Sequence, residues 1–103
     1  MLQSIVDEGS LETAMKNDEA LFFVGSYDIN SIMEEEVFED AEEEAPYLDF
    51  YKINVSDVSL DLLNVHFIPC LIFVKDGIEV YRGGGFLNKE KLLKKIKQYY
   101  DSE

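Results

Sequence analysis

The chain has 103 residues, 47% of them hydrophobic, and a formal net charge of −13, which predicts one domain over residues 1–103 with enough apolar side chains for a core. So acidic a chain is excluded from binding nucleic acid through phosphate contacts, which need a basic face, and is repelled by anionic membranes. Since a single cysteine forms no internal disulfide, and neither a signal-peptide pattern nor an apolar run of about 18 residues is present, we expect a cytoplasmic protein.

Strands and helices alternate in the first half. Residues 2–7 predict a short strand, and residues 11–17 predict a helix capped by Asp7 or Ser10. The apolar run 20–25 predicts a central strand buried on both faces. A long helix should then begin at Asp28 as its N-cap and end at Pro46. Its predicted apolar stripe consists of Ile29, Ile32, Met33, Val37 and Ala41.

Eight of the eleven residues from 34 to 44 are acidic. An acidic run can indicate disorder, but the helical spacing of the apolar residues favours a solvated helix face. The aromatic, alternating segment 47–55 predicts another strand. Ser56 and Asp57 should cap a short helix that ends near Leu63, with Asn64 as a left-handed exit residue.

A β-hairpin is predicted over residues 68–82. Six apolar residues and Pro69 make up the run 68–74, and Asp76-Gly77 follows as a tight turn. Pro69 should lie at the start of the first hairpin strand, because it cannot donate a hydrogen bond to a sheet. The glycines at 83–85 favour a bulge or close strand packing. Asn88 should cap the final helix, in which Leu92, Leu93, Ile96 and Tyr99 face the core.

The order βαβαβαββα resembles that of thioredoxins over roughly residues 4–100. The segments that carry the resemblance are 52–57, the Ile68-Pro69 step with its hairpin, Gly85 before the last helix, and the strand and long helix of the first half. The resemblance implies a three-layer α/β/α fold with a central mixed sheet and a cis proline at Pro69. It also implies that the second and last helices cover the same face of the sheet. The acidic run would then neighbour five lysines, Lys89, Lys91, Lys94, Lys95 and Lys97.

The redox chemistry of thioredoxins is missing from this sequence. Matched to the family, the two cysteines of Cys-x-x-Cys fall at Tyr27 and Asn30, neither of which can form a thiolate or a disulfide. The buried aspartate of the family falls at Leu21, and the proline of its second helix at Glu35, while Lys52 is the candidate match for its lysine. Thioredoxin turnover through a dithiol is therefore excluded on chemical grounds.

Cys70 and His66 leave one catalytic alternative open. Cys70 fits a small buried core residue, and under the alternative it would be a lone reactive thiol beside the substrate groove. His66 fits an exposed loop residue, although it could approach the same groove. One cysteine and one histidine make no metal site, and the exposed carboxylates lack the convergent oxygens of a tight calcium site. The glycine triplet lacks the spacing of a phosphate-binding loop, so no cofactor is expected.

We therefore expect a redox-inactive, thioredoxin-like domain that binds a protein or an extended peptide. The resemblance implies a groove beside the cis proline, whose predicted residues are Tyr27, Asp28, Asn30, His66, Phe67, Ile68 and Pro69. Two alternatives stay open: a thiol–disulfide or glutathione-linked oxidoreductase using Cys70, and a subunit that docks its acidic helix on a basic partner. Capping and solvation would also explain Tyr27, Asn30 and Ser31.

Overall fold

The computed structural model describes residues 2–17, 19–84 and 88–100. The elements are β1 (Gln3–Ile5), α1 (Glu8–Met15), β2 (Glu19–Gly25), α2 (Ile29–Glu44), β3 (Asp49–Asn54), α3 (Leu60–Leu63), β4 (Cys70–Lys75), β5 (Ile78–Gly83) and α4 (Lys89–Tyr100). This is the predicted order βαβαβαββα. Gly85, expected just before the last helix, lies outside the described residues.

The strands form one mixed sheet in the order β1-β3-β2-β4-β5. β1, β3 and β2 run parallel, whereas β4 is antiparallel to both β2 and β5. Asp76 and Gly77, at φ values of 56° and 75°, join β4 to β5. Two successive residues with positive φ are typical of the type I′ turn that suits a two-residue hairpin, so the predicted hairpin is confirmed.

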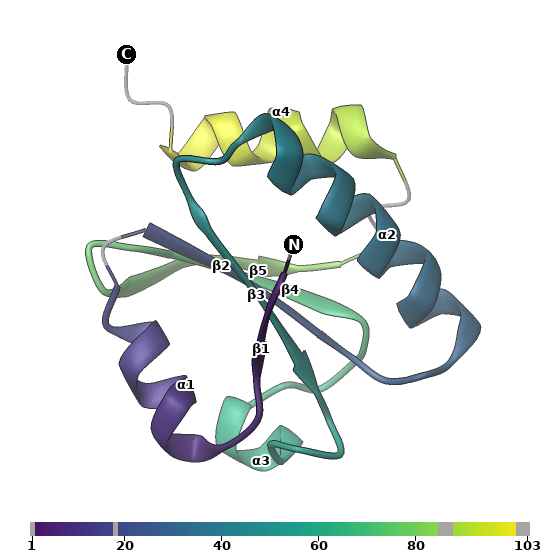
Figure 1. Ribbon diagram of the computed structural model, residues 1–103, viewed down its shortest axis with the longest axis vertical. Coiled ribbons are helices and arrows are strands. Elements are labelled where there is room, and N and C mark those ends of the chain that lie inside the picture. The colour runs from purple at the N-terminus through teal and green to yellow at the C-terminus, as the bar shows by residue number, and fades with distance from the viewer. Residues whose placement is uncertain (1, 18, 85–87, 101–103) are drawn as a thin grey trace.

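Helices cover both faces of the sheet, which gives the three layers seen in Figure 1. α2 and α4 lie on one face, where Phe23, Phe38, Phe50 and Phe73 pack in one core cluster. α1 and α3 lie on the other face, where a second cluster contains Phe22 and Ile72. β2 supplies side chains to both clusters and is almost fully buried, as its apolar run predicted.

The predicted apolar stripe of α2 is confirmed only in its second half, where Ala41 is buried and Val37 packs against the core cluster. Ile29, Ile32 and Met33 are exposed, and the buried positions are Ser31, Glu34, Phe38 and Ala41. These follow the spacing i, i+3, i+7 and i+10, which defines a helix face rotated from the predicted stripe. Phe38 takes the core position because its ring lies between Phe23 and Phe50, at centroid distances of 5.7 and 5.0 Å. Three large apolar side chains are therefore left exposed near the start of the helix.

The predicted proximity of the acidic and lysine-rich helices is confirmed. α2 and α4 pack together, and Lys89 Nζ lies 2.6 Å from Glu44 Oε2. Tyr100, which the sequence did not place in the core, is buried, and its hydroxyl donates to the carbonyl oxygens of Ala20 and Val74. α4 is thereby attached to the two central strands β2 and β4.

Most predicted caps are confirmed, and one is wrong. Asp7 accepts from the Ser10 amide at the start of α1, Asn88 accepts from the Lys91 amide, and Asn64 has a left-handed φ of 55°. Ser56 and Asp57 do not cap α3. This helix begins three residues after Asp57, and the Ser59 hydroxyl accepts from the Leu62 amide.

Candidate functional site

Asp28 organises the turn between β2 and α2, and it acts as the predicted N-cap. Its Oδ1 accepts from the Ser31 amide at 2.9 Å, and its Oδ2 accepts from the hydroxyls of Ser26 and Ser31. The hydrogen bond from the Ser26 hydroxyl, followed by that from the Ser31 amide, lowers the pKa of Asp28 below its usual value. The carboxylate of Asp28 is therefore committed to holding the turn.

The residues at the two thioredoxin cysteine positions are exposed at this turn. Tyr27 precedes the cap with 81% of its surface exposed, and Asn30 is exposed in the first turn of α2. Ile29 lies between them with 73% exposure. The start of α2 thus presents an aromatic ring, a branched aliphatic side chain and an amide to solvent.

The segment before β4 lies beside this turn. β2 and β4 are paired with Val24 opposite Cys70, so the chain leaving β2 and the chain entering β4 meet at the same end of the sheet (Figure 1). His66 and Phe67 are exposed, Ile68 and Pro69 are partly buried, and the Ile68–Pro69 peptide bond is cis. Among the described residues, no backbone hydrogen bond involves Phe67 or Ile68.

Gly84, the residue after β5, packs closely against Pro69. A Cβ atom at this position would lie 2.6 Å from the carbonyl oxygen of Pro69, which is too close for any side chain. The predicted role of the glycines in close packing thus applies to Gly84, which keeps the strand end against Pro69. The β4–β5 pairing has an irregular register between Phe73 and Val74, which is away from the glycines where a bulge was considered.

Cys70 follows Pro69 but faces the core. Its exposure is 1%, and its thiol donates to the Leu71 carbonyl oxygen at 3.8 Å. Burial raises the pKa of the Cys70 thiol, and the nearby Arg82 guanidinium only partly opposes this effect. Because the thiolate is the reactive form, the structure disfavours a nucleophilic Cys70. His66 is exposed, whereas the thiol is enclosed in the core.

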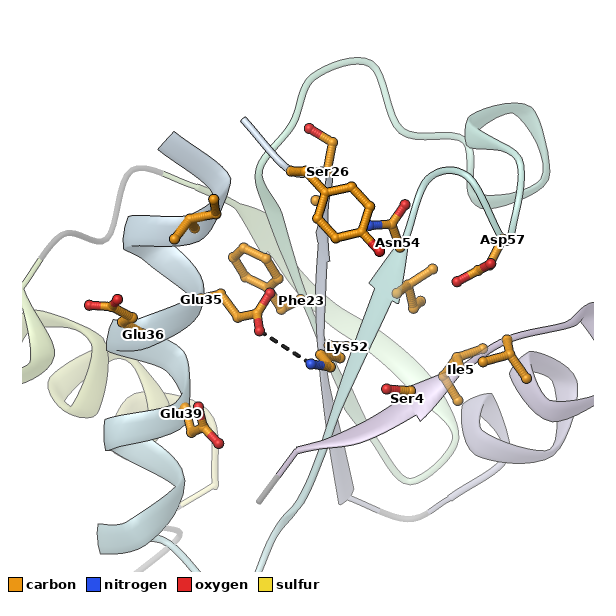
Figure 2. A pocket seen from close by; sticks show the side chains of 15 residues that line it. Ser4, Ile5, Phe23, Ser26, Glu35, Glu36, Glu39, Lys52, Asn54 and Asp57 are labelled. Atoms are coloured by element: carbon orange, nitrogen blue, oxygen red, sulfur yellow. Dashed lines mark hydrogen bonds and ion pairs between the residues drawn. The ribbon is translucent and has the colours of Figure 1, made fainter. Parts of the chain in front are cut away.

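The structure contains a cavity that the sequence did not predict, and Tyr27 is among its lining residues. Figure 2 shows this cavity from close by. It has a volume of about 440 Å³ and lies between α2 and the strands β1 and β3. We call it the acidic cavity, and its principal lining residues are Ile5, Phe23, Tyr27, Glu35, Glu39, Lys52 and Asp57. None of the predicted residues His66 to Pro69 lines it.

Lys52 is the basic residue of the acidic cavity. Its Nζ points toward Glu35 and lies 3.4 Å from Oε2, as Figure 2 shows. The alternation of β3 could have signalled this placement, because Lys52 follows the core residue Phe50 by two positions and so shares its sheet face. The position of Glu35 opposite Lys52 depends on helix packing, which the sequence pattern does not specify.

Neither a metal cluster nor a membrane span is found in the parts of the chain that the structure describes. In those ranges, no three His, Cys, Asp or Glu side chains are grouped closely enough to hold a metal ion. No helix within the same residues is long and apolar enough to cross a bilayer.

The fold is that of thioredoxins. A thioredoxin from Trypanosoma brucei brucei superimposes with a TM-score of 0.86 at 15% identity, over 99% of this chain and 93% of that one. Mitochondrial thioredoxin 3 from Saccharomyces cerevisiae gives 0.82 at 19% identity, over 94% of each chain. A mutant thioredoxin from Halobacterium salinarum gives 0.81 at 22% identity, over 94% of this chain and 88% of that one. No protein-family model and no curated protein matches the sequence.

These likenesses confirm the predicted thioredoxin-like, three-layer fold. At identities of 15–22% they establish the fold and not the activity. The single cysteine also confirms that the chain has no Cys-x-x-Cys motif.

Proposed function

We propose that this thioredoxin-like domain is a redox-inactive binding module for an extended segment of a partner protein. The binding surface comprises Tyr27, Asp28, Asn30 and the segment 66–69, which we call the loop surface. Tyr27, Asn30 and the segment 66–69 would contact the partner, while Asp28 holds the turn that presents them.

The observation that carries the proposal is an apolar surface at the position of the thioredoxin dithiol. Tyr27 is 81% exposed and Phe67 is 52% exposed, and Ile29, two residues after Tyr27, adds an exposed aliphatic side chain. Large aromatic side chains supply much of the binding energy in protein interfaces, because they bury a large area and lose little conformational freedom. The residues that replace the dithiol are therefore suited to binding.

The backbone of the loop surface is consistent with a partner segment that binds in an extended conformation. Phe67 and Ile68 make no backbone hydrogen bonds to described residues, and the segment lies directly before β4. An extended peptide placed beside such a segment gains main-chain hydrogen bonds, as in other forms of β-strand addition. Side-chain contacts with Tyr27 and Phe67 would then select the partner sequence.

Burial of Cys70 supports the non-catalytic function over the monothiol alternative. A thiol-exchange reaction needs a thiolate that a substrate sulfur can reach. Cys70 is inaccessible, and its pKa is raised by burial. Neither requirement is met in the folded protein.

Site-specific photocrosslinking tests the proposal. A benzophenone amino acid is introduced at Tyr27 in one protein and at Tyr47 in a matched control. Tyr47 is also highly exposed, but it precedes β3 at the opposite end of the sheet, because Ala20 pairs with Asp49 and Gly25 with Asn54. Both proteins are irradiated in native lysate, with and without an excess of unmodified protein.

The proposal predicts a discrete crosslinked protein from position 27 that unmodified protein competes away and that position 47 does not capture. The additional substitution Phe67→Asp should abolish this product, because a charge replaces an exposed aromatic contact while the core is unchanged. Equal capture from positions 27 and 47, or capture that survives Phe67→Asp, would refute a binding role for the loop surface.

A further inference from the structure

We propose that the acidic cavity binds the guanidinium group of an arginine in the partner segment. This inference rests on the proposed binding function and specifies the chemistry of the partner. Tyr27 belongs to both the loop surface and the lining of the acidic cavity. One extended segment can therefore pair with residues 67–68 and place a neighbouring side chain in the cavity.

The size and walls of the acidic cavity suit a long side chain. Its volume of about 440 Å³ falls in the range of roughly 300–1,000 Å³ that is common for ligand sites. Val6 and Ile32, which are 58% and 45% exposed, supply apolar surface to the lining, and Tyr27 supplies an exposed ring. An arginine side chain matches these walls, because its methylene stem covers apolar surface and its planar head stacks on aromatic rings.

The charges in the acidic cavity favour a cation. Glu35 and Glu39 lie one turn apart on α2, and Asp57 follows β3 on the other side (Figure 2). With Glu36, the lining has four carboxylates and one ammonium, that of Lys52, which leaves three formal negative charges. An anionic ligand such as a phosphate is therefore disfavoured in this cavity.

Lys52 shows that a cationic group already lies in the acidic cavity. The Lys52–Glu35 pair has an N–O distance of 3.4 Å, and 41% and 33% of these side chains are exposed. A pair that is this long and solvated contributes little stability, so an incoming guanidinium can share or replace it at small cost. Arginine is preferred to a second lysine, because its fork donates two parallel hydrogen bonds to one carboxylate.

A metal ion is a weaker candidate than an organic cation. The carboxylates of the acidic cavity are spread along a helix face and across to β3, and within the described ranges no three such groups converge on a metal position. Hard divalent cations require several convergent oxygens at short distances. A guanidinium, whose donors lie on several edges of a plane, can use carboxylates that are farther apart.

The test uses capped amino acids, so that it does not depend on finding the partner. N-acetyl-arginine methylamide is titrated into the 15N-labelled protein, and amide chemical shifts report binding. Capped lysine tests the preference for guanidinium, and capped citrulline has nearly the same shape as arginine without its charge. We expect saturable shifts near Tyr27, Glu35 and Lys52 with arginine, weaker binding of lysine, and no saturable binding of citrulline.

Three variants test the residues responsible. Glu35→Gln should weaken arginine binding by about two- to fivefold, as expected for an exposed ion pair. Lys52→Met should strengthen it, because the competing ammonium is removed. Glu43→Gln is the matched control, since it removes one charge from an exposed position of α2 outside the acidic cavity and should leave the affinity unchanged.

Equal binding of citrulline and arginine, or an equal loss of affinity in Glu43→Gln and Glu35→Gln, would overturn the proposal. Absence of saturable shifts with capped arginine would overturn it too. These failures differ from failure of the proposed function, because crosslinking from position 27 and its loss in Phe67→Asp do not require the acidic cavity.

Discussion

Asp28 holds the turn between β2 and α2 through hydrogen bonds to its carboxylate. In thioredoxins, the turn before the second helix carries the dithiol, whereas here the carboxylate of Asp28 accepts hydrogen bonds from Ser26 and Ser31 at that position. These bonds satisfy amide and hydroxyl donors at the helix N-terminus. The turn is therefore held by polar contacts without any cysteine.

The lowered pKa of Asp28 makes this contribution dependent on pH. Since the native state favours the charged form, the stabilisation is present above the ordinary pKa of 3.8 and is lost as the pH falls through the lower native pKa. Asp28→Asn should therefore reduce the loss of unfolding free energy between about pH 6 and pH 3. Urea unfolding at both pH values measures the free energy of unfolding of the wild type and of Asp28→Asn. Glu12→Gln, which removes an exposed carboxylate, is the control. An unchanged pH dependence in Asp28→Asn would contradict the assignment.

Cys70 should behave as a core residue in thiol chemistry. Because its side chain is buried and its pKa is raised, an aromatic disulfide reagent should react with it slowly in the native protein and quickly in denaturant. Absorbance of the released thiolate at neutral pH follows both rates. Rapid, stoichiometric reaction in the native state would revive the monothiol alternative.

At the level of elements, the sequence predicted which segments form helices and strands better than it predicted which face of a helix is buried. Caps and turns depend on neighbouring residues, so Asp28, Asn88 and Asp76-Gly77 could be placed from the sequence. The face of α2 depends on how the helix packs on β2 and β3. Phe38 was therefore missed, and exposed residues such as Ile29 were assigned to the core.

The corrected face of α2 can be tested by two truncations. Phe38 is fully buried among aromatic rings, so Phe38→Ala should cost about 3–5 kcal/mol of unfolding free energy. Met33 belongs to the same helix but is 48% exposed, so Met33→Ala should change stability by about 0.5 kcal/mol or less. Urea unfolding of both variants measures the difference. Similar losses in the two variants would mean that the observed helix face is wrong.

The contact between α2 and α4 should be sensitive to salt. Lys89→Glu places a negative charge beside Glu44 and the acidic run, so it should destabilise the protein more at low salt than at high salt. Glu44→Lys in the same chain should restore part of the loss by reversing the pair. Thermal melts at two ionic strengths measure both effects. A loss that is independent of salt, or no recovery in the double variant, would argue against an electrostatic contact.

For the whole molecule, much more of the fold than of the candidate site could be predicted from the sequence. The alternation of strands and helices and the hairpin follow from local patterns, and the position of the missing dithiol follows from the resemblance to thioredoxins. The acidic cavity could not be predicted in this way. Glu35 and Lys52 are 17 positions apart, and their proximity results from the packing of α2 on the sheet. Tyr27 was predicted at the site, but its place in the cavity required the structure.

The acidic residues of the chain are not all neutralised to the same extent by lysines, and this affects where a charged partner would bind. Lysines of α4 lie near the acidic run at one end, where Lys89 contacts Glu44, whereas Glu35 and Glu39 line the cavity. The carboxylates of the cavity retain an excess over Lys52. The proposed partner segment, which carries an arginine, is therefore expected to bind at the cavity and not at α4.

The central claim, that binding has replaced disulfide chemistry on this fold, is tested most directly by turnover of a protein disulfide with dithiothreitol as reductant. The wild type and Cys70→Ser should both show the uncatalysed rate, whereas a chain carrying Tyr27→Cys and Asn30→Cys should exceed it, because the two thiols then lie at the start of α2. Turnover by the wild type that disappears in Cys70→Ser would contradict the claim.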